Sequence, residues 1–145
     1  MAKKIKAVVL DSWAVIAYLE DEPAAERIAD IISDAHEEEI PLLMSVVNAG
    51  EVWYIVAREA SVSDADASIK QLRDLGIEFV DANWELSREA GYFKSRNKMS
   101  FADCFAAALA KQKQGHLATG DPEFKQVEAE IEIIWLPLKE SRKGG

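Results

Sequence analysis

Four acidic residues stand where a carboxylate could do chemistry. Asp11 follows the apolar run "KAVVL" and precedes a helix-like segment, and Asp121 follows "HLATG" in a similar way. Glu51 lies within the apolar helical stretch "GEVWYIVA", where an unpaired carboxylate facing a core would be costly. Asp103 stands three residues after Ser100 in "SFADCFAAALA". If the fold brings them together, these oxygens suit Mg²⁺ or Mn²⁺.

Carboxylates that share one site repel one another, and burial makes their charges more costly. A divalent cation offsets that repulsion, activates water and stabilises a phosphate under attack. Phosphodiester hydrolysis is the matching reaction, with Mg²⁺ or Mn²⁺ as the cofactor. Cys104 is the only cysteine, so a thiolate zinc cluster is excluded, and His36 and His116 fit structural roles better than catalytic ones.

Each acid also has a purely structural interpretation. Asp103 could complete a capping box with Ser100, Asp11 could cap the helix that starts at residue 12, and Asp121 could be a turn residue before Pro122. Capping alone does not explain why all four acids would share one edge of a sheet. Both interpretations remain open at this point.

The sequence alternates between strand and helix patterns. Apolar runs predict strands over 6–10, 41–45, 77–82, 116–120 and 131–136. Helical spacing predicts helices over 12–20, 21–39, 45–60, 61–76, 84–97 and 100–115, and a short turn or helix over 122–128. Ser63 is the expected cap of the fourth helix, and Gly76 and Gly115 are the expected helix stops.

This alternation predicts an α/β fold with a central, mostly parallel sheet and helices on both faces. In such sheets, sites form beyond the carboxyl ends of the strands. Asp11 and Asp121 follow strands, while Glu51 and Asp103 lie in early turns of helices. All four should therefore converge on one edge.

Length and composition predict one domain over residues 1–138 and a flexible polar tail over 139–145. No apolar run is long enough for a signal peptide or a membrane span, so the expected location is cytoplasmic. The net charge of -9 argues against a broad electrostatic grip on nucleic acid. Three basic residues before Asp103 could still seat a phosphate chain: Lys94, Arg96 and Lys98.

Several polar and aromatic residues are secondary candidates. Ser12 and Thr119 flank the outer acids and could hydrogen-bond a carboxylate or a phosphate, although both could be ordinary strand-end caps. Asn48 lies one turn before Glu51 and could support it. Four tryptophans could stack RNA bases, but core or interface packing is favoured for each: Trp13, Trp53, Trp84 and Trp135.

Four motifs in this order resemble the PIN-domain ribonucleases, and most closely the VapC toxins of toxin-antitoxin modules: "VVLDSWAVIAYLE", "NAGEVWYIVAR", "SFADCFAAALA" and "HLATGDPEF". They span nearly the whole chain, and all four acids are present. The resemblance implies that Asp11, Glu51, Asp103 and Asp121 form the metal site. It implies that Ser12 and Thr119 contact the metal-binding carboxylates or the phosphate.

The resemblance also implies a three-layer α/β/α sandwich and Mg²⁺- or Mn²⁺-dependent endonucleolytic cleavage of RNA. The expected partners are a VapB-like antitoxin, whose tail brings a basic side chain to the metal site, and a second copy in a homodimer. Asp11 and Asp103 would be the principal metal ligands, and Glu51 and Asp121 would complete the site and orient the attacking water. Acidic excess suits a basic inhibitor.

Other functions fit the sequence less well. An aspartyl phosphatase needs a second acid two residues after its nucleophile, where this chain has Trp13. No phosphate-binding glycine loop of a nucleotide switch is present. A PIN nuclease that works without an antitoxin and a binding module that no longer cuts RNA remain as alternatives.

Overall fold

The computed structural model describes residues 4–138. Its five strands form one sheet in the order β3-β2-β1-β4-β5, and every neighbouring pair runs parallel. The strands are β1 Val8–Leu10, β2 Leu42–Ser45, β3 Ile77–Val80, β4 His116–Thr119 and β5 Glu132–Trp135. The predicted parallel sheet is confirmed, although the strands at its two ends are shorter than their apolar runs suggested.

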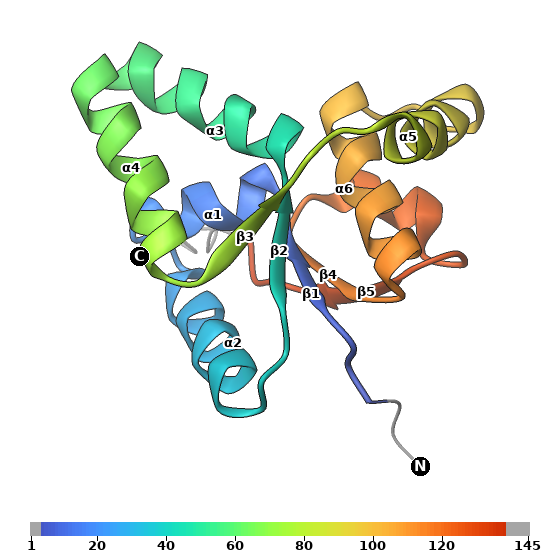
Figure 1. Ribbon diagram of the computed structural model, residues 1–145, viewed down its shortest axis with the longest axis horizontal. Coiled ribbons are helices and arrows are strands. Elements are labelled where there is room, and N and C mark those ends of the chain that lie inside the picture. The colour runs from blue at the N-terminus through green and yellow to red at the C-terminus, as the bar shows by residue number, and fades with distance from the viewer. Residues whose placement is uncertain (1–3, 139–145) are drawn as a thin grey trace, which may run out of the picture.

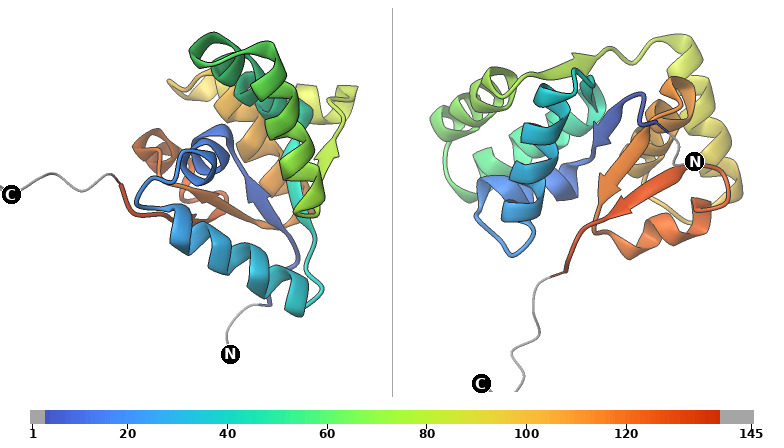
Figure 2. Two further views of the ribbon diagram at one scale, coloured as in Figure 1. Left: turned by 90° about the vertical axis from the view of Figure 1, so that its left-hand side faces the viewer. Right: turned by 90° about the horizontal axis from the view of Figure 1, so that it is seen from below.

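Six helices and one short 3₁₀ helix, η1, connect the strands in this part of the chain. They are α1 Ser12–Leu19, α2 Ala25–Glu37, α3 Val46–Glu59, α4 Val62–Asp74, α5 Trp84–Arg96, α6 Phe101–Lys113 and η1 Pro122–Val127. The right-hand view of Figure 2 shows α5 and α6 on one side of the sheet and α1 to α4 on the other. The three-layer α/β/α sandwich is thereby confirmed.

The middle strands supply side chains to two apolar cores. Val9 and Leu117 pack with Phe93 and the alanine-rich α6 on one face, whereas Val8 and Leu10 pack with α1 and α2 on the other. All residues of β1 and β2 are buried, as expected for central parallel strands. The site therefore rests on strands held from both sides.

Local turn chemistry differs from the sequence prediction at two positions. Ser61, not Ser63, caps α4, because its hydroxyl accepts the hydrogen bond from the Asp64 amide at 3.0 Å. Gln114 adopts the left-handed conformation at the end of α6, and Gly115 is needed for another reason. A Cβ on Gly115 would lie 2.7 Å from the carbonyl oxygen of Ala7, so the close approach to β1 requires glycine.

The strand order places a crevice at the carboxyl edge between β1 and β4. From β1 the chain proceeds through β2 to β3, then crosses to β4 on the other side of β1 (Figure 1). Parallel sheets bind ligands where the winding direction reverses in this way. Within residues 4–138, no helix is long and apolar enough to cross a membrane. The tail predicted over 139–145 lies outside the described residues.

Candidate metal centre

Asp11 lies at the end of β1 and is almost completely buried. Its Oδ1 accepts a hydrogen bond from the Ala14 amide at 2.8 Å and so caps α1. Its Oδ2 accepts a hydrogen bond from the Thr119 hydroxyl at 2.5 Å. The same Thr119 oxygen accepts from the Asp121 amide at 3.0 Å. Thr119 thus connects the acids that follow β1 and β4.

Glu51 enters the site from the second turn of α3. The Ser12 hydroxyl donates a short hydrogen bond to Glu51 Oε1. Asn48, one turn earlier and fully buried, donates from Nδ2 to the Ala102 carbonyl at 3.1 Å. These contacts attach α3 to the start of α1 and to the residue before Asp103. The expected support of Glu51 by Asn48 stays a prediction.

Asp103 lies in the first turn of α6, where its amide donates to the Ser100 hydroxyl at 3.1 Å. Carboxylate oxygens of Asp103, Asp121 and Glu123 lie within 4.8 Å of one another. Glu123 was not predicted from the sequence. Its backbone amide donates to Asp121 Oδ1 at 2.9 Å, so the turn that starts η1 brings its side chain to the same place.

Burial and neighbouring carboxylates disfavour the ionised forms of Asp11 and Asp103. Burial raises the pKa of Asp11 to about 7, with further raising by Asp103 and Asp121, while the bonds from Thr119 and Ala14 lower it. Burial also raises the pKa of Asp103 to about 6, with Asp121 as the next contribution and Glu51 and Glu123 adding to it. A bound cation would relieve this repulsion between like charges.

The structural interpretations of the acids prove compatible with a shared site. Asp11 caps α1 and Asp121 caps η1, yet both remain within electrostatic reach of Asp103. Capping occupies one oxygen lone pair of each carboxylate and leaves others available. Five carboxylate side chains and no thiolate or imidazole give a donor set that fits Mg²⁺ or Mn²⁺.

A cleft of about 350 Å³ opens over these acids. Its lining includes the acids Glu51, Asp103 and Asp121 and the apolar side chains of Trp13 and Ile55. The cleft therefore offers carboxylates for a cation together with apolar contacts for a flat or apolar group.

The predicted basic residues do not line this cleft. Lys94 donates to the Met99 carbonyl at 2.5 Å, and Arg96 pairs with Glu130 at 3.3 Å while lying over the Tyr92 ring. Their part in binding RNA, with that of Lys98, stays a prediction. His36 and His116 also lie outside the cleft, and burial raises the pKa of the Cys104 thiol to about 11.

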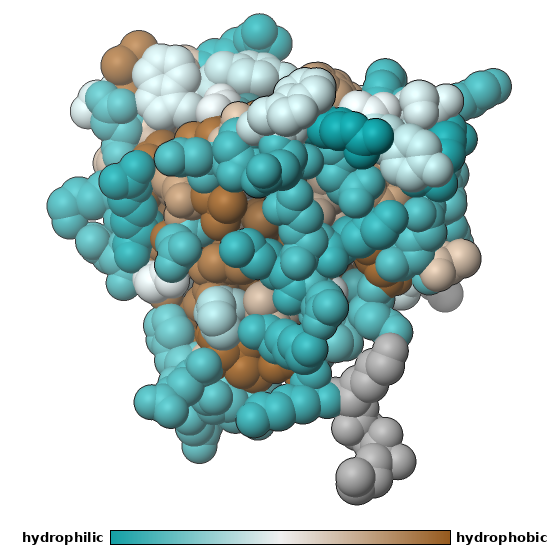
Figure 3. Space-filling model, turned by 45° about the vertical axis from the view of Figure 1, so that its right-hand side comes forward, coloured by the Kyte–Doolittle hydropathy of each residue, from teal (hydrophilic) through white to brown (hydrophobic). Residues whose placement is uncertain are grey.

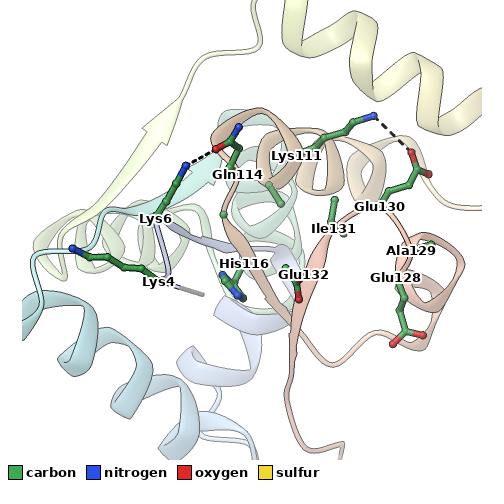
Figure 4. A pocket seen from close by; sticks show the side chains of 12 residues that line it. Lys4, Lys6, Lys111, Gln114, His116, Glu128, Ala129, Glu130, Ile131 and Glu132 are labelled. Atoms are coloured by element: carbon green, nitrogen blue, oxygen red, sulfur yellow. Dashed lines mark hydrogen bonds and ion pairs between the residues drawn. The ribbon is translucent and has the colours of Figure 1, made fainter. Parts of the chain in front are cut away.

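A larger hollow of about 560 Å³ lies where β4 and β5 begin, at the opposite edge of the sheet (Figure 4). Lysines and glutamates line it together, and some of these side chains form hydrogen bonds or ion pairs. Lys6 donates to Gln114 at 2.6 Å, and Lys111 lies 3.7 Å from Glu130. Within residues 4–138, the group of three carboxylates whose oxygens lie within 4.8 Å of one another is at the carboxyl edge and not in this hollow.

Three solved structures with low sequence identity share this fold. VapBC2 of Rickettsia felis, bound to a promoter DNA fragment, is 12% identical, with a TM-score of 0.72 over 90% of this chain and 99% of that one. VapC20 of Mycobacterium tuberculosis, a toxin that cleaves the sarcin-ricin loop, is 16% identical (TM-score 0.65; coverage 83% and 95%). FitAcB of Neisseria gonorrhoeae is 19% identical, with a TM-score of 0.63 over 88% of this chain and 96% of that one.

No curated protein matches the chain in sequence. The family comparison is decisive, because it depends on the sequence pattern and covers most of the chain. Residues 8–130 match the PIN domain, a span that runs from β1 past η1 and includes all the acids of the cleft. The chain therefore belongs to the PIN domain family.

Proposed function

We propose that the protein is a Mg²⁺- or Mn²⁺-dependent endoribonuclease that acts as the toxin of a type II toxin-antitoxin system. The observation that carries the proposal is the group of carboxylates at the β1–β4 crevice, on residues matched to the PIN domain. VapC20, which shares this fold, is a toxin that cleaves the sarcin-ricin loop, and this supports the choice of RNA as substrate.

The positions of the side chains suggest a role for each carboxylate. Asp103, Asp121 and Glu123 group their oxygens most tightly, and Asp11 lies behind them with its orientation fixed by Thr119. We assign Asp11 and Asp103 as principal ligands of the cation, with Asp121 and Glu51 completing the site. Glu123 joins the set as a further ligand. When bound, the cation would neutralise the phosphate and lower the pKa of the attacking water.

The remaining chemistry falls to the protein. Glu51, held by Ser12, would accept the proton of the attacking water and direct the water in line with the scissile bond. The products would be a 5′-phosphate and a 3′-hydroxyl, and the RNA 2′-hydroxyl would not act as nucleophile. Asp121 would help to hold the cation beside the leaving 3′-oxygen, which would depart with the electrons of the broken P–O bond and take up a proton from solvent water.

A VapB-like antitoxin is the proposed inhibitor. The solved structures that share this fold include complexes of VapB with VapC, among them one from nontypeable Haemophilus influenzae. The cleft combines acidic side chains with the apolar Ile16 and Ile55, which suits an inhibitor segment with both basic and apolar side chains. Such a segment would cover the carboxylates directly. We place the system in the cytoplasm, where its RNA substrate is.

A homodimer is the proposed assembly. Figure 3 shows brown apolar surface between polar side chains on one face of the molecule. The first residues of α3, α5 and α6 are all exposed and apolar: Val46, Trp84 and Phe101. Val46 and Phe101 begin α3 and α6, the helices that carry Glu51 and Asp103, so exposed apolar side chains lie near the acidic site and support association there. Sedimentation of Trp84→Glu against the wild type tests this assignment.

Cleavage of a mixed transfer and ribosomal RNA pool tests the proposed function. Purified protein, verified free of antitoxin, is incubated with Mg²⁺, Mn²⁺ or chelator beside an Asp103→Asn preparation. We expect metal-dependent cutting that the variant loses while it keeps its fold. Equal cutting by both preparations would indicate a contaminant. Binding without cutting would favour the non-catalytic module, and cutting by a protein with no antitoxin gene beside its own would favour a processing nuclease.

A further inference from the structure

Trp13 forms part of the wall of the acidic cleft. It follows Ser12 in the first turn of α1, is half-buried, and lines the cleft together with Glu51 and Asp121. Part of its ring packs against the core on the α1 side of the sheet. An aromatic ring therefore lies beside the carboxylates that would hold the cation.

The backbone of Gly120 supports one face of this ring. A Cβ added to Gly120 would lie 2.3, 2.5 and 2.6 Å from three atoms of the six-membered ring of Trp13. Such similar distances place the glycine over the ring face, because a contact at the rim would favour one atom. Gly120 does not have a positive φ, so the ring, and not the backbone conformation, requires the absence of a side chain. The backbone of Gly120, the residue before Asp121, thus packs against the ring of Trp13.

The indole N–H of Trp13 has no acceptor among residues 4–138, whereas Trp53 donates to Asp66 and Trp135 donates to Glu128, each at 2.9 Å. The Trp13 nitrogen is also not among the buried polar atoms without partners, so it reaches solvent. The ring is half-buried, and its edge at this donor is accessible to solvent.

Charge favours a surface of this kind, because no basic side chain of the residues that the structure describes lines the cleft. The chain carries a net charge of -9, and Lys94 and Arg96, the basic residues near Asp103, are engaged with the protein itself. Phosphate contacts from basic side chains thus contribute little at the cleft. Stacking on an aromatic ring works with any base and does not depend on net charge.

We infer that Trp13 is a stacking platform for an RNA base next to the scissile phosphate. This inference rests on the proposed nuclease function and names the part of the substrate that the cleft recognises. The phosphate lies over Asp103 and Asp121, and the adjoining base lies on the ring that Gly120 holds in place. Trp13 would determine how tightly single-stranded RNA binds and would not take part in proton transfer.

A cycle of protein and RNA changes tests this inference. An RNA oligonucleotide that the wild type cuts is compared with versions in which one nucleotide near the cleavage position is abasic. Trp13→Leu should raise KM roughly 5- to 150-fold, the range for one stacked base, while Trp13→Phe keeps most of the affinity. The abasic change should raise KM for the wild type but not further for Trp13→Leu.

Trp53→Leu is the matched control, since Trp53 is also half-buried but does not line the cleft. RNA binding by anisotropy, in the Asp103→Asn background with Mg²⁺, should reproduce the pattern without cleavage. Photocrosslinking tests the contact in the wild-type protein itself, with 5-iodouracil in the RNA at the nucleotide that the abasic change removes. Mass spectrometry should then place the crosslink on Trp13.

The outcomes separate this inference from the function on which it rests. An abasic effect of equal size in the wild type and in Trp13→Leu would overturn the inference, as would a crosslink elsewhere. A Trp13→Leu variant that cuts RNA normally but escapes its antitoxin would assign the ring to the protein partner instead. If wild-type protein neither cuts nor binds RNA, the proposed nuclease function itself fails.

Discussion

The hydroxyl of Thr119 lies 2.5 Å from Oδ2 of Asp11, although 108 positions separate the two residues in the chain. Both are buried, and they end the neighbouring parallel strands β4 and β1. One hydroxyl thus donates to the acid after β1 and accepts from the backbone of the acid after β4. The position of the proposed metal site depends on the pairing of these two strands.

Thr119→Val should weaken the site through the loss of this donor. Asp11 would keep its burial but lose the bond that lowers its pKa, so the ionised form would cost more. We expect a loss of about 1.5–3 kcal/mol in the free energy of unfolding at pH 8, as for hydrogen bonds to charged groups. Urea unfolding without metal measures it. Thr119→Ser keeps the hydroxyl and serves as the control; equal stability of the valine and serine variants would contradict the prediction.

The metal-free protein should become less stable as the pH rises from about 4 to about 7. Asp11 and Asp103 have pKa values of about 7 and about 6 in the folded chain, above their ordinary value of 3.8. Between these limits the folded state binds more protons than the unfolded state, so stability is present at low pH and lost as the pH passes 6 and 7. The slope should be about 1.4 kcal/mol per pH unit for each proton involved.

Urea unfolding with chelator, at several pH values between 4.5 and 7.5, measures this trend. Mg²⁺ at pH 7.5 should restore the lost stability, because a ligand that binds the folded state alone stabilises it. The double variant Asp11→Asn, Asp103→Asn should show a flatter profile. A stability that rises between pH 5 and 7 would contradict the assignment of the raised pKa values.

Glu123→Gln should raise the Mg²⁺ concentration needed for half-maximal cleavage by several-fold. Glu123 shares its group of oxygens with Asp103 and Asp121, and glutamine keeps the side-chain length while removing the charge. Binding of Mn²⁺ followed by electron paramagnetic resonance gives a readout that does not depend on cleavage. Glu37→Gln, an exposed acid at the end of α2, controls for the change in net charge. Identical effects of both variants would remove Glu123 from the site.

Asn48→Ala should lower both stability and cleavage. The amide donates to the Ala102 carbonyl beside Asp103, and the loss of this hydrogen bond should cost about 0.5–1.5 kcal/mol. Asn97→Ala is a matched control, because Asn97 donates to the Phe93 carbonyl at 3.0 Å away from the cleft. Both variants should lose stability. When each is assayed at a temperature that gives the same folded fraction, only Asn48→Ala should show a lower kcat.

The sequence predicted the position of the main acids well because they follow directly from strand order. Once β1 and β4 are parallel neighbours, the residues after them meet at one edge, and no side-chain detail is needed. Glu51 was predicted from its cost in an apolar helix, which the Ser12 hydrogen bond and the open cleft explain. Topology and periodicity thus placed these acids near one another, whereas their assignment as a metal site came from the family resemblance.

Glu123 and Gly115 could not be predicted in the same way. The role of Glu123 depends on the tight turn at Asp121, where one amide bond decides the direction of the next side chain. Gly115 was interpreted as a helix stop, but the close carbonyl of Ala7 is distant in sequence. Lys94 and Arg96 suggested a phosphate contact because their intramolecular acceptors were not apparent from spacing.

The strand order also sets when the site can form during synthesis. β1 is made first, but its neighbour β4 and the acid that follows begin only at residue 116. A nascent chain that has reached residue 115 already contains Asp11, Glu51 and Asp103, yet lacks the strand that fixes Asp11 and the turn that supplies Asp121. If the protein is the toxin that we propose, a chain that ends before residue 116 lacks part of its active site, so cleavage depends on completion of the C-terminal strands.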